Sequence, residues 1–158
     1  MPKNILKLVL SIAICQGAGL IGTVFTVSSI ENWYNFLNQP SFRPPNSLFG
    51  PVWTILYTLM GISLYWILSK GTKKKEVSSA LKLFAVHLVF NATWSIVFFG
   101  MHNLPLSLVN IVVLWILIVM VMIKFYKIDK KASLILLPYL AWVSFATVLN
   151  YNIFLLNR

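Results

Sequence analysis

The chain alternates between long apolar stretches and short polar connections. Five stretches are long enough to cross about 30 Å of hydrocarbon as helices, which takes roughly 20 residues each. They cover residues 6–27, 51–68, 83–100, 104–123 and 132–156. Apolar residues fill consecutive positions in them rather than every second one, which excludes the strands of a membrane β-barrel. The pattern predicts an all-α membrane protein, a five-transmembrane-helix bundle in a single domain over residues 1–158.

The connection between the first two predicted spans, residues 28–50, differs from a flexible linker. It contains Pro40, Pro44 and Pro45 together with large apolar side chains such as Trp33. Prolines restrict φ, and a loop with this number of large apolar side chains is not stable in water. We therefore expect it to fold onto the mouth of the bundle as a lid. Pro51 is expected at the first position of the second helix, where its missing N–H costs little.

Composition agrees with a membrane protein and narrows the chemistry. The chain is 59% hydrophobic and 10% charged, which is not the composition of a water-soluble domain. Its acids are scattered at Glu31, Glu76 and Asp129, and Cys15 is its one cysteine. This argues against hydrolysis by paired carboxylates and against zinc sites, so no metal or cofactor is expected to be required. No Asp, Glu or Arg falls inside a predicted span, which disfavours ion-coupled transport.

The net charge of +10 comes from basic clusters between the spans. In a five-span topology one side holds eleven of the thirteen basic residues, namely Lys3, Lys7, Lys70, Lys73, Lys74, Lys75, Lys82, Lys124, Lys127, Lys130 and Lys131. The positive-inside rule then predicts a cytoplasmic N-terminus, an outside C-terminus and an extracytoplasmic lid in a bacterial cytoplasmic membrane. The expected partner of these clusters is the anionic lipid bilayer rather than nucleic acid.

Three of the predicted spans carry aromatic and amide residues at helical spacing. The stripes are Trp53 and Tyr57 in the second span, His87, Asn91 and Trp94 in the third, and Trp142, Phe145 and Ala146 in the fifth. Polar groups facing lipid would stay unsatisfied, so the stripes should face the bundle interior. Any single Trp fits packing or an interfacial belt better, whereas converging stripes fit a flat, largely apolar ligand. His87 alone fits a neutral hydrogen-bonding partner better than a metal ligand.

The order and spacing of these residues closely resemble the TspO/MBR family of tryptophan-rich sensory proteins and translocator proteins. Matching positions are Trp33-Tyr34, Leu37, Pro40-Ser41, Pro44-Pro45, Phe49-Gly50-Pro51-Val52-Trp53, Leu56-Tyr57, Met60-Gly61, Asn91, Trp94, Phe98-Phe99-Gly100, Pro138-Tyr139, Trp142, Phe145-Ala146-Thr147 and Leu149-Asn150. The likeness runs through the whole chain. It implies a five-helix bundle, a lid and a pocket that accepts porphyrins and synthetic translocator ligands.

The resemblance also implies a set of ligand-binding residues. Carried over position by position, the pocket falls on Trp33, Tyr34, Trp53, Tyr57, Asn91, Trp94, Trp142, Phe145 and Ala146. We add His87, which stands where an amide is expected four residues before Asn91. The implied function is porphyrin (tetrapyrrole) binding in a membrane, with porphyrin as ligand or substrate.

Some bacterial members of the family are linked to light- and oxygen-dependent breakdown of protoporphyrin. Without paired carboxylates or a metal cluster, the reactive groups beside a bound porphyrin would include an oxidisable indole, and Trp142 and Trp53 fit that catalytic role. Porphyrin transport and ligand-controlled stress signalling remain alternatives to breakdown.

Small residues in the first span predict a close helix contact. Ala13 and Gly17 lie four apart, as do Ala18 and Gly22. The pattern does not say whether the contact joins two protomers or packs the first helix into its own bundle. The family resemblance implies a homodimer.

Overall fold

The computed structural model describes residues 3–158, so residues 1 and 2 of the predicted domain lie outside the described part. Its elements are α1 (Lys3–Asn32), η1 (Tyr34–Phe36), α2 (Asn46–Leu68), α3 (Lys75–Ser95), η2 (Ile96–Gly100), α4 (Leu104–Ile128), α5 (Lys130–Leu134) and α6 (Leu137–Leu156). With α3 joined to η2 and α5 to α6, five helical segments of the described chain are long and apolar enough to span a membrane. The predicted fold class is confirmed.

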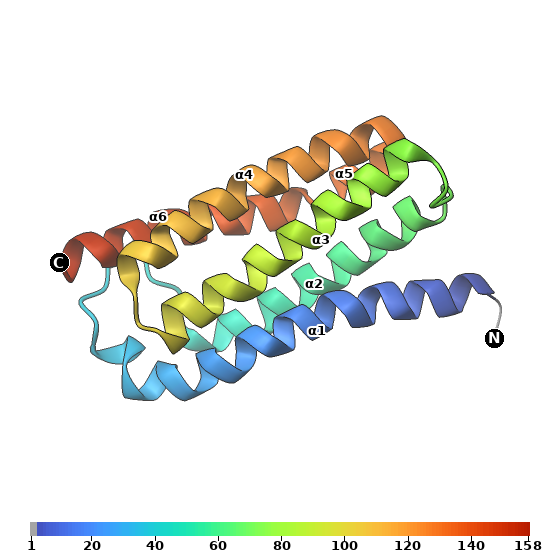
Figure 1. Cartoon of the computed structure of the whole chain (residues 1–158). Helices are drawn as coiled ribbons and strands as arrows, with labels where there is room; N and C mark the ends of the chain where they lie inside the picture. Colours follow the sequence, from blue (N-terminus) through green and yellow to red (C-terminus); the bar gives the residue numbers. More distant parts are fainter. Residues whose placement is uncertain (1–2) are drawn as a thin grey trace.

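The five spans lie side by side along a common direction (Figure 1). α1 packs mainly on α2 and also on α3, α3 packs on α4, and α4 packs on α6. The lid loop, the α3–α4 turn and the C-terminus share one end of the bundle, called the lid end below (Figure 1). The start of α1, the α2–α3 connection and the α4–α5 corner share the opposite, lysine-rich end.

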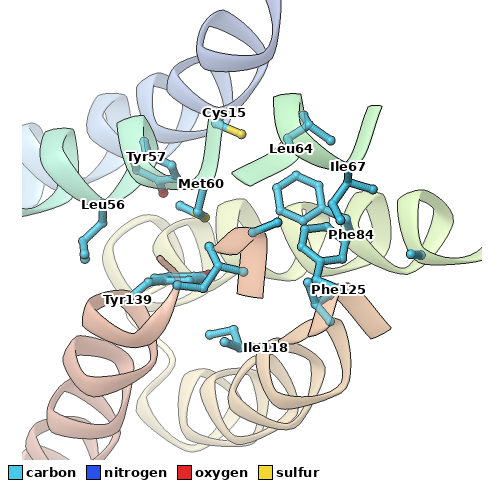
Figure 2. Packing of buried hydrophobic residues seen from close by; sticks show 14 of the residues in the cluster. Cys15, Leu56, Tyr57, Met60, Leu64, Ile67, Phe84, Ile118, Phe125 and Tyr139 are labelled. Carbon is cyan, nitrogen blue, oxygen red and sulfur yellow. The ribbon is translucent and has the colours of Figure 1, made fainter. Parts of the chain in front are cut away.

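Buried side chains form two groups. The larger group fills the bundle from its middle toward the lysine-rich end, where the rings of Phe84 and Phe125 stack with centroids 5.6 Å apart (Figure 2). The smaller group lies at the lid end and includes Tyr34, Phe98 and Phe99. Tyr34 comes from the lid and is only 1% exposed. The lid is therefore folded into the bundle, as the sequence predicts.

The second helix corrects the sequence prediction at its start. α2 begins at Asn46, so Pro51 lies inside the helix rather than at its first position, and the predicted boundary at residue 51 is wrong. The helix extends back to Pro45, whose φ of −57° and ψ of 142° give an extended N-cap. Pro51 is the sixth residue of α2, beyond the first turn, so its missing N–H leaves one helical carbonyl without its backbone partner.

The fifth span is also not the continuous helix expected over residues 132–156. It consists of α5 and α6, with a turn at Ile135 and Leu136 between them. Pro138 lies in the first turn of α6, where a residue without an N–H begins a helix readily but does not continue one. α1, α3 and α4 also extend beyond their apolar runs, because hydropathy reports hydrocarbon thickness rather than helix length.

Candidate functional site

A cavity of about 510 Å³ lies between α1, α2, α3 and α6, with residues of the lid against it. Its wall is rich in aromatic side chains, namely Tyr34, Phe49, Trp53, Tyr57, Trp94, Phe98, Phe99 and Trp142. No charged side chain of residues 3–158 lines it. The same residues contain no group of three His, Cys, Asp or Glu side chains that could hold a metal ion. An aromatic cavity with few polar groups suits a flat, largely apolar molecule.

The structure brings seven of the ten predicted ligand-binding residues together around this cavity. They are Tyr34, Trp53, Tyr57, Asn91, Trp94, Trp142 and Ala146. They come from the lid, α2, α3 and α6, so the three stripes do converge. Whether these side chains bind a ligand stays a prediction.

The other three predicted residues do not line the cavity. Trp33 stacks on His102 with ring centroids 4.1 Å apart, and Phe145 packs against Trp142 at 5.6 Å and Phe42 at 6.2 Å. His87 lies behind the wall, where it is 1% exposed. Phe145 packs directly on a lining side chain, and none of the three forms the surface of the cavity.

The wall contributed by α1 is absent from the sequence prediction. Gly19, Gly22, Thr23 and Thr26 line the cavity from this helix. A Cβ at Gly19 would lie 2.4 Å from Tyr57 Cε2, so the close contact of these small residues is within the bundle. The available signal was the pair of threonines, whose hydroxyls share a helix face with the glycines. An open face remains at Gly17, where an added Cβ would meet nothing within 4 Å.

Most polar groups on the wall have hydrogen-bond partners inside the protein. Trp94 Nε1 donates to Asn150 Oδ1 at 3.0 Å, and Asn150 Nδ2 lies 3.3 Å from the Ser107 hydroxyl. The Tyr57 hydroxyl donates to Asn91 Oδ1. The indole N–H of Trp142 differs, because it is buried and no described atom accepts its hydrogen bond. This nitrogen atom has almost no accessible surface of its own, so it does not face the cavity and its N–H stays unpaired within the wall.

The cavity opens sideways between α1 and α2. Its exposed lining residues include Leu20, Thr23 and Val27 on one helix and Pro51 and Thr54 on the other. These α1 residues belong to the apolar run 6–27, so the opening lies at the depth of the bilayer.

Hydrogen bonds close the opening on the side nearer the lysine-rich end, and others fasten the lid at the lid end. Gln16 Nε2 donates from α1 to the Thr54 carbonyl oxygen at 2.9 Å. In the lid, the Asn38 N–H donates to Asn157 Oδ1 at 2.9 Å, and Asn157 Nδ2 donates back to the Asn38 carbonyl oxygen at 2.8 Å. This pair of bonds ties the lid to the end of α6.

Arg43 holds the lid together from its outer side. Its guanidinium lies 5.0 Å from the Tyr34 ring centroid and donates to Asn35 Oδ1 at 2.9 Å. Burial raises the pKa of Tyr34 above its ordinary value, and the Arg43 charge opposes that rise. The Tyr34 phenol is therefore neutral near pH 7, so the described cavity wall carries no formal charge.

Fold and cavity together define a class, an integral membrane protein of five spanning helices with a lidded aromatic cavity. The TspO/MBR family model matches residues 11–156, and the chain belongs to the TspO/MBR family. It is 48% identical over 157 residues to the tryptophan-rich protein TspO of Chlorobaculum tepidum, with 99% of each chain covered. It is 34% identical over 133 residues to the translocator protein of Homo sapiens, which covers 83% of this chain and 78% of that protein. The predicted family resemblance is confirmed, and membership supports a membrane role related to tetrapyrroles in general terms.

Proposed function

We propose that the protein binds a porphyrin in the cavity between α1, α2, α3 and α6 and needs no resident cofactor to do so. The observation that supports this most is the aromatic, uncharged wall, which suits a flat macrocycle. Direct binding of protoporphyrin, followed through its Soret absorbance, tests the proposal.

The position of the cavity's opening favours a ligand that arrives from the bilayer. The opening between α1 and α2 lies at membrane depth, whereas the lid is fastened over the other side. Porphyrins without bound metal partition into membranes because most of their surface is apolar. The proposed ligand is thus taken up laterally, from the hydrocarbon rather than from water.

We also propose that the bound porphyrin is degraded in light and oxygen. Both atoms of dioxygen add across one methine carbon–carbon bond of the macrocycle, and that bond breaks to give two carbonyl groups, so no further oxidant or reductant is needed. An indole gives one electron to the light-excited macrocycle and takes it back within the same cycle, so it ends in its starting state. Trp142 and Trp53 are the two catalytic candidates because both line the cavity. Trp94 is the third indole on the wall, and its N–H already donates to Asn150 Oδ1.

Illumination of protoporphyrin-saturated protein in aerated detergent tests this role. Trp142→Phe keeps most of the flat contact and removes the indole, so we expect binding within about tenfold of the parent, near 1.4 kcal/mol, and loss of most of the degradation. A protein-free sample is the control. Equal Soret decay in variant and parent would remove Trp142 from the chemistry, and parent decay equal to the control would leave a binding protein.

A porphyrin transporter is the second candidate, favoured by a cavity that lies between the lateral opening and the lid. Porphyrin flux into sealed vesicles distinguishes transport from binding, and a signalling role predicts binding without flux or degradation.

The proposed setting is a bacterial cytoplasmic membrane with the N-terminus in the cytoplasm and the C-terminus outside. The proposed assembly is a homodimer, supported by the open α1 face around Ala13 and Gly17. Cross-linking between copies carrying Ala13→Cys in membranes tests that face, since no intermolecular product would exclude it.

A further inference from the structure

A chain of hydrogen bonds leads from the inner wall of the cavity into the protein. The Tyr57 hydroxyl bonds to Asn91 Oδ1, and Asn91 Nδ2 lies 2.7 Å from the Tyr139 hydroxyl. The Tyr139 hydroxyl lies 2.9 Å from His87 Nε2, and His87 Nδ1 lies 3.0 Å from the Phe84 carbonyl oxygen. Tyr57 and Asn91 line the cavity, whereas His87 and Tyr139 lie behind them. Figure 2 shows Tyr57 and Tyr139 reaching from α2 and α6 into the bundle interior.

The inner end of this chain fixes the direction of every bond. A carbonyl oxygen only accepts, so His87 Nδ1 must carry the hydrogen that Phe84 receives. In a neutral imidazole, Nε2 then has a lone pair and no hydrogen. The hydrogen bonds recorded for His87 go to a carbonyl and a phenol and include no carboxylate that would hold it protonated.

The donor and acceptor of each further hydrogen bond then follow in turn, from His87 out to the cavity. Tyr139 has one hydroxyl hydrogen and must donate it to His87 Nε2, so its oxygen accepts from Asn91 Nδ2. This orientation turns Asn91 Oδ1 toward Tyr57, whose hydrogen is then used by that bond. Tyr57 has no hydrogen left for a ligand, but its oxygen keeps a free lone pair.

We propose that His87 is a positioning residue that makes the Tyr57 hydroxyl an acceptor, so that the inner wall selects flat ligands with an N–H or O–H group. An amide at position 87 could turn either its oxygen or its nitrogen toward Tyr139 and would leave the direction open. A neutral histidine whose Nδ1 donates to the Phe84 carbonyl oxygen can offer Tyr139 only an acceptor, its Nε2 atom. This inference rests on the proposed function only in taking the cavity as the ligand site.

Two isosteric probes test the selection. Carbazole carries an N–H where dibenzofuran carries an oxygen, and both are flat, apolar tricycles. We expect calorimetric titration of the detergent-solubilised parent to show carbazole binding roughly three- to tenfold more tightly, the range of one neutral hydrogen bond. In His87→Leu the Tyr139 hydrogen is free to turn to Asn91, the chain can reverse, and the affinity ratio should fall to about one.

His102→Asn is the matched control, because it removes the other histidine from the lid end and leaves the chain behind Tyr57 unchanged. Asparagine tolerates the φ of 53° found at position 102. The carbazole preference should survive in this variant. Equal affinity of the two probes for the parent, failure of both to bind, or the same preference in His87→Leu would each overturn the inference.

A spectroscopic measurement keeps the inference testable if His87→Leu does not fold. The sequence has two histidines, so ¹⁵N-histidine labelling of the parent and of His102→Asn assigns the His87 signals. We expect Nδ1 to show a protonated, pyrrole-type shift and Nε2 an unprotonated, pyridine-type shift. A proton on Nε2 would overturn the inference without involving any ligand.

A protoporphyrin titration of the same parent sample separates this inference from the proposed function. Preference for carbazole without protoporphyrin binding would support the role of His87 and refute the proposed ligand. Protoporphyrin binding without a preference between the probes would refute the role of His87 alone.

Discussion

Single residues set the shape of the cavity where α1 passes the inner wall. A Cβ on Gly19 would lie 2.4 Å from Tyr57 Cε2, which is closer than any relaxed contact. The Tyr57 ring is held in place by its hydroxyl bond to Asn91 and cannot swing aside without losing that bond. The missing side chain at Gly19 therefore positions Tyr57 and, through it, the acceptor on the wall.

We expect Gly19→Ala to displace Tyr57 and to lower the free energy of unfolding by about 1 to 3 kcal/mol, the usual cost of overpacking. Gly50→Ala is the control, because an added Cβ there meets nothing within 4 Å. Thermal unfolding in detergent, followed by tryptophan fluorescence, measures both. Equal melting temperatures for the two variants would contradict the close contact at Gly19.

Helical spacing could identify most of the helix faces that line the cavity, but not how far along each helix the cavity extends. Asn91, Trp94 and Trp142 were accessible to prediction because the polar groups of a membrane helix must face inward, and the aromatic residues share a helix face with them. His87 lies on the same face as Asn91, yet one helical turn, about 5.4 Å, places it behind the cavity. Gly19 and Gly22 gave no such signal, because small residues indicate a close contact without naming the partner.

At the scale of elements, the lysine-rich end is fastened by one residue with two roles. Asp129 Oδ1 accepts from the Lys131 N–H at 2.9 Å as the N-cap of α5, and Asp129 Oδ2 lies 2.7 Å from Lys70 Nζ. The hydrogen bond from Lys70 is the main cause that lowers the pKa of Asp129 below its ordinary value. Asp129 thus joins the α2–α3 connection to the corner between α4 and α5.

We expect Asp129→Ala to lower the free energy of unfolding by about 1 kcal/mol near pH 7, mostly through the lost cap. Lys70 is 43% exposed, so solvent screens the ion pair and it adds little. Because the folded-state pKa of Asp129 is lowered, its stabilisation is present above the ordinary carboxyl pKa of about 4 and is lost as pH falls through the lower value.

Melting temperatures of parent and Asp129→Ala, compared at about pH 7 and about pH 3, measure this effect. The difference between the two proteins should shrink at the acidic pH. A difference that is the same at both values would show that the carboxylate charge plays no part.

The sequence was sufficient to predict that the spans exist, but not where their helices begin and end. Continuous apolar runs require helices in a membrane, so the five-span bundle was predictable. The turn at Ile135 and Leu136 lies inside an apolar run and leaves no trace in hydropathy. Proline is favoured at the first position of a helix, so Pro51 indicated a start at residue 51, whereas the helix begins after the extended Pro45 and includes Pro51 in its interior.

At the scale of the whole molecule, the distribution of lysines makes an orientation testable. Ser47 lies at the lid end and Thr72 in the α2–α3 connection, and both are exposed. Cys15 is fully buried, so an introduced cysteine can be read without background from it. An impermeant thiol reagent added to intact cells should label Ser47→Cys and not Thr72→Cys. Labelling of Thr72→Cys alone would reverse the proposed topology.

The most direct measurement is a protoporphyrin titration of the parent, Trp53→Ala and Trp115→Ala in detergent, followed through the Soret band. Trp53 lines the cavity, whereas Trp115 is 38% exposed on α4 and does not. We expect saturable binding by the parent, affinity lower by about 1 to 3 kcal/mol in Trp53→Ala, and unchanged affinity in Trp115→Ala. Absence of binding by the parent, or equal affinity of parent and folded Trp53→Ala, would contradict a porphyrin site in this cavity.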